Sequence, residues 1–217
     1  MDDGLPAVLA EAADGRFPPE DGVVTILPQP SPRDAGVIGF TAHAVIFTDA
    51  DPEWVRRQLP AGDLSAPLGP AFLHALCQAT NRRAGSIDML CVAQPLPGQP
   101  PLPLTALGEV AAAAGADHPR VRRALGYRDD VRAWQAEGGI VLLRRGVAGR
   151  METAIEVDPA HRGSGLGRRL ATAARHLAPP DEPVWAQVAP ANAASVRAFL
   201  AAGFTPVGAE ALLARKA

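Results

Sequence analysis

The pattern of apolar and polar positions predicts strands and helices in the first half of the chain. Residues 36–48 form an apolar run dominated by β-branched and aromatic residues, which predicts a strand, and residues 86–93 predict a second, shorter strand. Helices are expected at residues 51–59, where Asp-Pro marks a helix start, and at residues 70–83, where apolar residues recur at helical spacing. Residues 23–27 are a short β-like run in an otherwise Asp-, Gly- and Pro-rich beginning. The first half is therefore expected to be α/β.

The second half shows a group of short strand signals and then alternates between helix and strand. Three β-prone runs separated by glycines predict an antiparallel meander, because glycine-rich turns join neighbouring antiparallel strands. A helix is expected next, since leucines and alanines form a stripe at helical spacing and the arginines fall outside it. Asn192 and Gly203 are a favourable N-cap and a favourable C-terminal glycine for another helix. The strands predicted here are residues 131–136, 140–145, 151–157, 184–188, 205–207 and 211–214, and the first helix is residues 165–177.

A proline-rich segment separates the two halves. Residues 94–103 hold five prolines in ten residues, a composition that favours an extended linker. We therefore predict a divergent N-terminal α/β region at residues 1–103 and a second domain at residues 104–217, which would open on helices at residues 104–114 and 118–125. The expected fold class is α/β, with a mixed, mostly antiparallel sheet flanked by helices.

Composition and the longest apolar run restrict the environment of the protein. Of the 217 residues, 47% are hydrophobic and 20% are charged, which is typical of a globular protein. The longest apolar run, residues 36–47, is shorter than the about 20 residues that a membrane-spanning helix needs. The chain opens on Met-Asp-Asp without a signal-peptide pattern, and its two cysteines match no metal-ligand spacing. We expect a cytoplasmic protein with reduced thiols, no membrane contact and no bound metal.

The basic residues exclude two enzyme classes and are unevenly distributed. Lys216 is the only lysine, so the chain lacks the lysine that a phosphate-loop NTPase or a pyridoxal enzyme needs. Residues 1–115 carry 13 acidic and 6 basic residues, a net charge of −7, whereas residues 116–217 carry 10 acidic and 15 basic residues, a net charge of +5. This asymmetry favours an anionic ligand in the second half and a small cationic substrate beside the first; solvated surface charge is the alternative. No interleaving of basic and aromatic residues indicates a nucleic-acid partner.

Residues 155–170, with the sequence IEVDPAHRGSGLGRRL, carry the most informative motif. Glycines at this spacing leave backbone N–H groups unobstructed at the positive end of a helix, which suits a phosphate group. The phosphate-loop motif does not fit because Gly-Lys-Ser/Thr is absent. The dinucleotide fingerprint does not fit because Arg168 stands where its last glycine belongs. A glycine-rich turn that binds no ligand is the alternative.

The motif resembles the pyrophosphate-binding signature of the GNAT superfamily of acyl-CoA-dependent N-acyltransferases. The resemblance rests on Val-x-Pro at Val157, followed by Arg-x-x-Gly-x-Gly from Arg162. A second block, residues 184–204, resembles that superfamily's next strand, its Asn-x-x-Ser/Ala helix start and a closing Gly-Phe. The resemblance covers about residues 129–217. Residues 1–115 would then supply either the first strand and helices in divergent form or a degenerate second copy.

The resemblance implies that acetyl-CoA is the co-substrate and that backbone groups hold much of it. Residues 151–157 would be a splayed strand whose backbone, at Ile155 and Val157, binds the pantetheine arm and the acyl carbonyl. Asn192 would face the same arm, although N-capping alone is a sufficient role for it. The residues that would wrap the pyrophosphate are Arg162, Gly163, Ser164, Gly165, Leu166, Gly167 and Arg168.

The resemblance also implies direct attack of a primary amine on the thioester, which needs a base and an acid. The usual acid is a tyrosine seven positions after the Asn, where this chain has Phe199. Glu152 and Glu156, on one face of the same predicted strand, are the candidate bases; a solvent face paired with arginines is the alternative. Gln187 stands at another position where relatives carry a base, and glutamine cannot act as one.

These inferences lead to an expected function and to one alternative. We expect a GNAT-type N-acetyltransferase that transfers an acetyl group from acetyl-CoA to a small-molecule or peptide amine. The alternative is a non-catalytic acyl-CoA-binding sensor or regulatory module, which the phenylalanine at the position of the acid favours. The oligomeric state stays open between a monomer and a homodimer.

Overall fold

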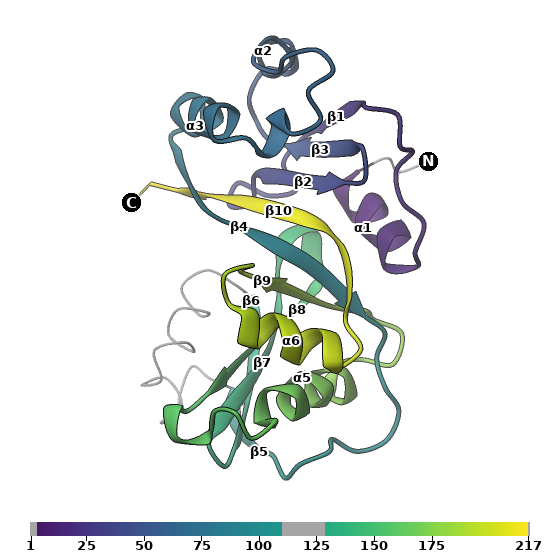
Figure 1. Ribbon diagram of the computed structural model, residues 1–217, viewed down its shortest axis with the longest axis vertical. Coiled ribbons are helices and arrows are strands. Elements are labelled where there is room, and N and C mark those ends of the chain that lie inside the picture. Colours follow the sequence, from purple (N-terminus) through teal and green to yellow (C-terminus); the bar gives the residue numbers. More distant parts are fainter. Residues whose placement is uncertain (1–3, 110–128, 217) are drawn as a thin grey trace. The chain divides into compact units, whose positions relative to one another are not determined.

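The computed structural model describes residues 4–109 and 129–216, which form ten strands and five α-helices (Figure 1). The mixed α/β fold that the sequence predicts is therefore confirmed. The chain divides into two compact units, one made of Met1–Leu90 with Pro206–Ala217 and the other of Cys91–Thr205. We call them the first and the second unit and describe each by itself. The predicted boundary within residues 94–103 stays a prediction.

The first unit contains a mixed sheet with the strand order β1-β3-β2-β10-β4. β2 and β3 form an antiparallel hairpin, β1 adds parallel to β3, and β10 adds antiparallel to β2. β10, the last strand in the sequence, therefore adds to a sheet whose other strands come from the first half of the chain. The strands are β1 (Val24–Leu27), β2 (Gly36–Phe40), β3 (His43–Phe47), β4 (Arg82–Ala93) and β10 (Thr205–Arg215).

Helices lie on both sides of the strands of the first unit (Figure 1). α2 (Pro52–Arg57) and α3 (Pro70–Ala79) pack on one side, where the buried Val55, Phe72 and Leu76 join Val37 and Ile46 of the sheet in one core. α1 (Leu5–Ala13) lies on the other side. A short 3-10 helix, η1 (Ala66–Leu68), precedes α3.

The second unit contains the predicted meander, extended by one parallel strand. The strand order is β9-β8-β7-β6-β5, antiparallel from β5 to β8 and parallel between β8 and β9. α5 and α6 lie beside each other against this sheet (Figure 1). The elements are β5 (Thr105–Glu109), β6 (Asp129–Ala136), β7 (Gly139–Arg145), η3 (Val147–Gly149), β8 (Met151–Val157), η4 (Pro159–His161), α5 (Leu166–Leu177), β9 (Val184–Val188) and α6 (Ala193–Ala201).

Three predictions for the first unit are wrong in the number or the length of the elements. The strand expected over residues 36–48 is the β2–β3 hairpin, whose turn places Ala42 in the left-handed region at φ 50°. The two strands expected over residues 205–214 are the single strand β10. The helix expected over residues 70–83 ends at Ala79, and β4 already begins at Arg82. The helix α1 was not predicted from the sequence.

One predicted helix in the second unit is contradicted as far as the structure describes it. Residues 104–114 were expected to be helical, but β5 occupies Thr105–Glu109 and pairs with β6. The rest of that segment and the helix predicted at residues 118–125 lie outside the described residues. In residues 4–109 and 129–216, no helix is long and apolar enough to cross a membrane. Within the same residues, no His, Cys, Asp and Glu side chains are grouped as a metal site.

Candidate functional site

The central feature of the second unit is the place where β8 and β9 part. The two strands run parallel but pair over two positions only, Met151 opposite Val184 and Glu152 opposite Trp185. β8 nevertheless continues to Val157 and β9 to Val188. From Thr153 onward, β8 therefore has no β9 neighbour, and this edge presents backbone groups that an extended ligand can pair with. Residues 151–157 were predicted to form a strand splayed from its neighbour, and these residues are β8, which diverges from β9.

β8 leads directly into the glycine-rich loop and α5. The loop passes through η4, and Gly163 and Gly165 both adopt left-handed backbone conformations, at φ 78° and 79°. Only glycine takes this region without strain, which explains the two residues locally. A Cβ built on either glycine would meet no atom within 4 Å, so open space lies beside both. The loop is thus shaped by its glycines and leaves room for another molecule.

The backbone amides of this loop are available donors. Within the described part of the chain, the N–H groups of residues 163–168 donate to no protein acceptor; the next amide, of Arg169, bonds to the carbonyl of Gly165 at 3.2 Å. The first N–H groups of any helix lack intrahelical partners, and the loop adds further amides to those of α5. Six successive donors at the positive end of a helix form a suitable site for an anion.

The side chains around the loop add positive charge. Arg162, Arg168 and Arg169 are exposed, and no acidic residue lies in the first turn of α5. Arg162 also donates through Nε to the carbonyl of Val157 at 3.4 Å, which holds the loop against the end of β8. Ser164 donates through its hydroxyl to the carbonyl of His161 at 2.7 Å. The residues predicted to wrap a pyrophosphate therefore form one continuous segment of the loop and the start of α5, which we call the loop of residues 162–168.

The remaining residues predicted to contact the cofactor lie on neighbouring elements. Ile155 and Val157 are half-buried on β8, and both approach Gly167 of α5, since their side chains lie 3.9 and 3.7 Å from a Cβ built there. Asn192 caps α6, because its side-chain oxygen accepts a hydrogen bond from the amide of Ser195 at 3.1 Å. The capping role of Asn192 is thus observed, while its contact with a pantetheine arm stays a prediction.

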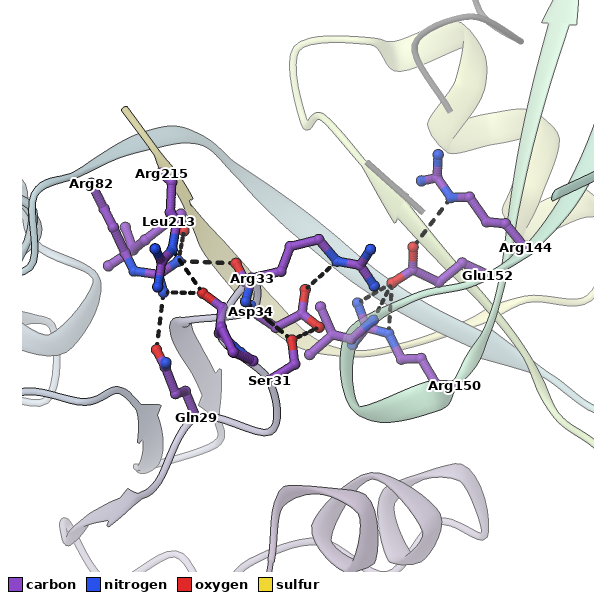
Figure 2. A network of polar contacts seen from close by, with 12 residues as sticks. Gln29, Ser31, Arg33, Asp34, Arg82, Arg144, Arg150, Glu152, Leu213 and Arg215 are labelled. Atoms are coloured by element: carbon purple, nitrogen blue, oxygen red, sulfur yellow. Dashed lines mark hydrogen bonds and ion pairs between the residues drawn. The ribbon is translucent and has the colours of Figure 1, made fainter. Parts of the chain in front are cut away.

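Glu152, one of the two candidate bases, is a buried and fully engaged carboxylate. Its side chain is 1% exposed, and arginines approach it from two sides (Figure 2). Gly146 makes room for it, because a Cβ on that glycine would overlap the carboxylate. Its donors are Arg144 Nε at 3.3 Å, Arg150 Nε at 3.0 Å, Gln187 Nε2 at 3.2 Å and the amide of Val147 at 3.3 Å.

This arrangement favours a positioning role for Glu152 over proton transfer. Several donors, two of them cationic, stabilise the charged form of a carboxylate and so weaken it as a proton acceptor. The alternative of pairing with Arg144 is observed, although Glu152 itself is buried and does not lie on a solvent face. Glu156 lies four residues further along β8, opposite Ile140, and is only half-buried. Of the two candidates, Glu156 is the more accessible.

No acid is present at the position of the usual tyrosine. Phe199 is 4% exposed and packs edge-on against Phe204, with ring centroids 5.0 Å apart and an interplanar angle of 88°. Its ring is therefore buried in the hydrophobic core beside Phe204, which follows the end of α6. The only tyrosine, Tyr127, lies outside the described residues.

The roles of Arg150 and Gly146, which contact and make room for Glu152, were not predicted from the sequence. The pairing of Arg144 with Glu152 had a signal, because the two are directly opposite in the predicted β7–β8 hairpin. Arg150 follows the turn η3, and its guanidinium stacks over the ring of Trp185 at 5.4 Å from the centroid. That approach depends on a non-repetitive turn, for which the sequence carries no periodic signal.

Comparisons with known proteins identify the family of this part of the chain. Residues 124–204 match the model of the acetyltransferase (GNAT) family. No curated protein matches the chain significantly. Among solved structures, a GCN5-related N-acetyltransferase from Kribbella flavida is similar, with 19% identity, a TM-score of 0.41 and coverage of 67% of this chain and 64% of the other. An acetyltransferase from the GNAT family from Colwellia psychrerythraea has 14% identity, a TM-score of 0.45 and coverage of 84% and 81%.

The match to the family model contains the structural features described above. It includes the meander, the parting of β8 and β9, the glycine-rich loop and α6. The chain aligns with less than two thirds of the length of the Kribbella flavida protein. Residues 124–204 form an acetyltransferase domain of the GNAT family.

Proposed function

We propose that the second unit binds acetyl-CoA and transfers its acetyl group to a primary amine. The observation that carries this proposal is the continuity of the parted β8 edge with the open loop of residues 162–168. A strand edge suits an extended, amide-containing arm, and a loop of unpaired amides suits a pyrophosphate. Acetyl-CoA contains both groups in one molecule.

The loop and the strand would hold different parts of this co-substrate. The amides of residues 163–168, with Arg162 and Arg168, would surround the pyrophosphate, where fixed donors and positive charge act together. Backbone groups of Ile155 and Val157 would pair with the pantetheine arm along the β8 edge. The thioester would then lie near the point where β8 and β9 separate.

Transfer would follow direct attack by the amine. The nitrogen bonds to the carbonyl carbon, the carbon–sulfur bond breaks, and the proton of the amine passes to a base, directly or through water. We assign the base to Glu156, because it is half-buried and so more accessible to a substrate, whereas Glu152 is 1% exposed and held by two arginines. Glu152 would instead position Gln187 and Arg144 on the same face of the sheet.

Release of free coenzyme A tests this function. Acetyl-CoA is incubated with the full chain and a panel of primary amines that includes matched cationic and anionic members, and thiol release is followed by absorbance. We expect amine-dependent release, faster with cationic amines because residues 1–115 carry a net charge of −7, and reduced about 100-fold in Glu156→Gln. Glu137→Gln, an exposed residue in the β6–β7 turn, is the matched control. Acetyl-CoA binding without thiol release for any amine would refute the transferase.

A non-catalytic acyl-CoA-binding module is the second candidate. Two observations favour it: the buried Phe199 at the position of the usual acid, and the engagement of Glu152 with arginines. Such a module binds acetyl-CoA through the same loop but releases no thiol. The amine panel therefore separates the two functions, while binding alone supports both.

A further inference from the structure

Three side chains of the first unit form a hydrogen-bonded chain that the function of the second unit does not use. Asp21 precedes β1, Thr25 lies on β1 and His43 opens β3. Nδ1 of His43 is 2.9 Å from Oδ1 of Asp21, and its Nε2 is 2.9 Å from Oγ1 of Thr25. The histidine is 8% exposed, so this geometry is held within the fold.

The chemistry of the partners determines the direction of both hydrogen bonds. The backbone amide of Val23 and the imidazole of His43 donate to Asp21 and lower the pKa of its carboxyl, which therefore stays ionised. A carboxylate only accepts, so Nδ1 of His43 carries the proton and donates it. Nε2 is then an acceptor, and the hydroxyl of Thr25 donates to it. A carboxylate, an imidazole and a hydroxyl in this order activate the hydroxyl as a nucleophile.

The hydroxyl lies where a substrate can approach. β1 is the last strand of the sheet in the first unit, and Thr25 is half-buried, not enclosed. Apolar side chains surround this end of the hairpin: Phe40 is the register partner of His43, and its ring lies 6.2 Å from that of Phe17. Phe17 and Val23 are each 50% exposed, which is high for large apolar residues. This apolar rim suits a short acyl chain.

We propose that Asp21, His43 and Thr25 form a second reactive site, in which Thr25 accepts an acyl group from a carboxylic ester with an apolar acyl chain. Oγ1 of Thr25 bonds to the carbonyl carbon, and its proton passes to Nε2 of His43. The ester carbon–oxygen bond breaks, and the alcohol oxygen leaves with its electron pair and takes the proton from Nε2 of His43. Water, which gives a proton to Nε2, later attacks the acyl-threonine; the bond to Oγ1 breaks, Oγ1 regains the proton and the acid is released. Thr25 and His43 are catalytic residues in this step, and Asp21 is a positioning residue.

Reaction with p-nitrophenyl hexanoate tests the site in the full chain. We expect a burst of one nitrophenolate per chain and a hexanoyl mass increment on the peptide that contains Thr25. The burst rate should exceed that of p-nitrophenyl acetate, because the rim favours the longer chain. Thr25→Val should abolish burst and label, Thr25→Ser should keep both, and His43→Gln should slow the burst about 100-fold. Thr41→Val, at the exposed hairpin turn, is the matched control.

Several results would overturn the site. These are a label on another residue, a burst that Thr25→Val leaves unchanged, or no label in the wild-type chain. Asp21→Asn should keep the fold by circular dichroism yet slow the burst, whereas a merely structural aspartate would leave the burst rate of the folded fraction unchanged. The outcome is independent of acetyl-CoA binding, because no residue of the glycine-rich loop takes part.

Discussion

At the scale of single residues, Glu152 shows how strongly a neighbourhood changes what a carboxylate can do. The sequence places it correctly on one face of β8 with Glu156. Its position opposite Arg144 is also predictable, from the register of the β7–β8 hairpin. Its burial and its contact with Arg150 are not predictable, because they depend on Gly146 and on the turn η3. Glu152, which the sequence suggests as a base, is therefore better explained as the centre of an ion-pair network with Arg144 and Arg150 (Figure 2).

The network predicts a large stability effect for one substitution. Glu152→Ala leaves Arg144 and Arg150 without their shared carboxylate, and removal of one partner of a buried ion pair destabilises a protein by about 3–5 kcal/mol. Urea unfolding should show this loss in the free energy of unfolding. Glu137→Ala, at an exposed turn position, should change it by less than about 0.5 kcal/mol. Equal stabilities of the two variants would disprove the role given to Glu152.

At the scale of elements, the sequence predicts those whose signal is local. The meander is readable because glycines mark its turns, and α6 is readable because Asn192 caps it. The β2–β3 hairpin was missed because its left-handed turn residue is Ala42, which carries no turn signal. β10 was divided into two strands because Pro206 and Gly208 interrupt its β-prone sequence, whereas pairing with β2 keeps it continuous.

One buried arginine joins several elements of the first unit. Arg82, at the start of β4, is 1% exposed and donates to three carbonyls and one side-chain amide, those of Arg33, Leu213, Pro32 and Gln29 (Figure 2). Burial lowers the pKa of its guanidinium, and the neutral acceptors compensate its charge only in part. Arg82 thus ties the segment before β2 to β4 and β10.

Replacement of Arg82 by methionine is therefore expected to loosen this segment. Each lost hydrogen bond to a charged donor contributes about 1.5–3 kcal/mol, and the hydrogen bond to the carbonyl of Leu213 is buried, so a loss of roughly 3 kcal/mol or more is expected. Hydrogen exchange should also show faster exchange in β10. Arg83→Met, at the exposed neighbouring position, is the control. If both variants exchange and unfold like the wild type, Arg82 has no structural role.

At the scale of the whole molecule, the division into units is the feature that the sequence predicts least well. The proline-rich segment suggests a boundary there, but no local pattern indicates that β10 joins β2, about 170 residues earlier in the chain. The second unit was easier to predict, because the glycines of its loop motif indicate an unusual backbone conformation and the arginines around them indicate an anionic ligand. The family match of residues 124–204 falls on the part where the motif is found.

The central claim is that the loop of residues 162–168 binds the pyrophosphate of acetyl-CoA. Gly165→Asp places a Cβ and a negative charge beside the unpaired amides, in the space that is open in the structure. Gly98→Asp is a matched control, because Gly98 is exposed, has φ 86° and is also in the second unit, outside the loop. Both variants carry the same backbone strain and the same change in charge.

Calorimetric titration of acetyl-CoA into the wild-type chain, Gly165→Asp and Gly98→Asp tests this claim most directly. We predict one site per chain in the wild type, similar binding in Gly98→Asp, and a dissociation constant raised about tenfold or more in Gly165→Asp, equivalent to at least about 1.4 kcal/mol. Circular dichroism should be the same for all three. Absence of binding in the wild type, or equal dissociation constants for the folded Gly165→Asp and the wild type, would contradict the account.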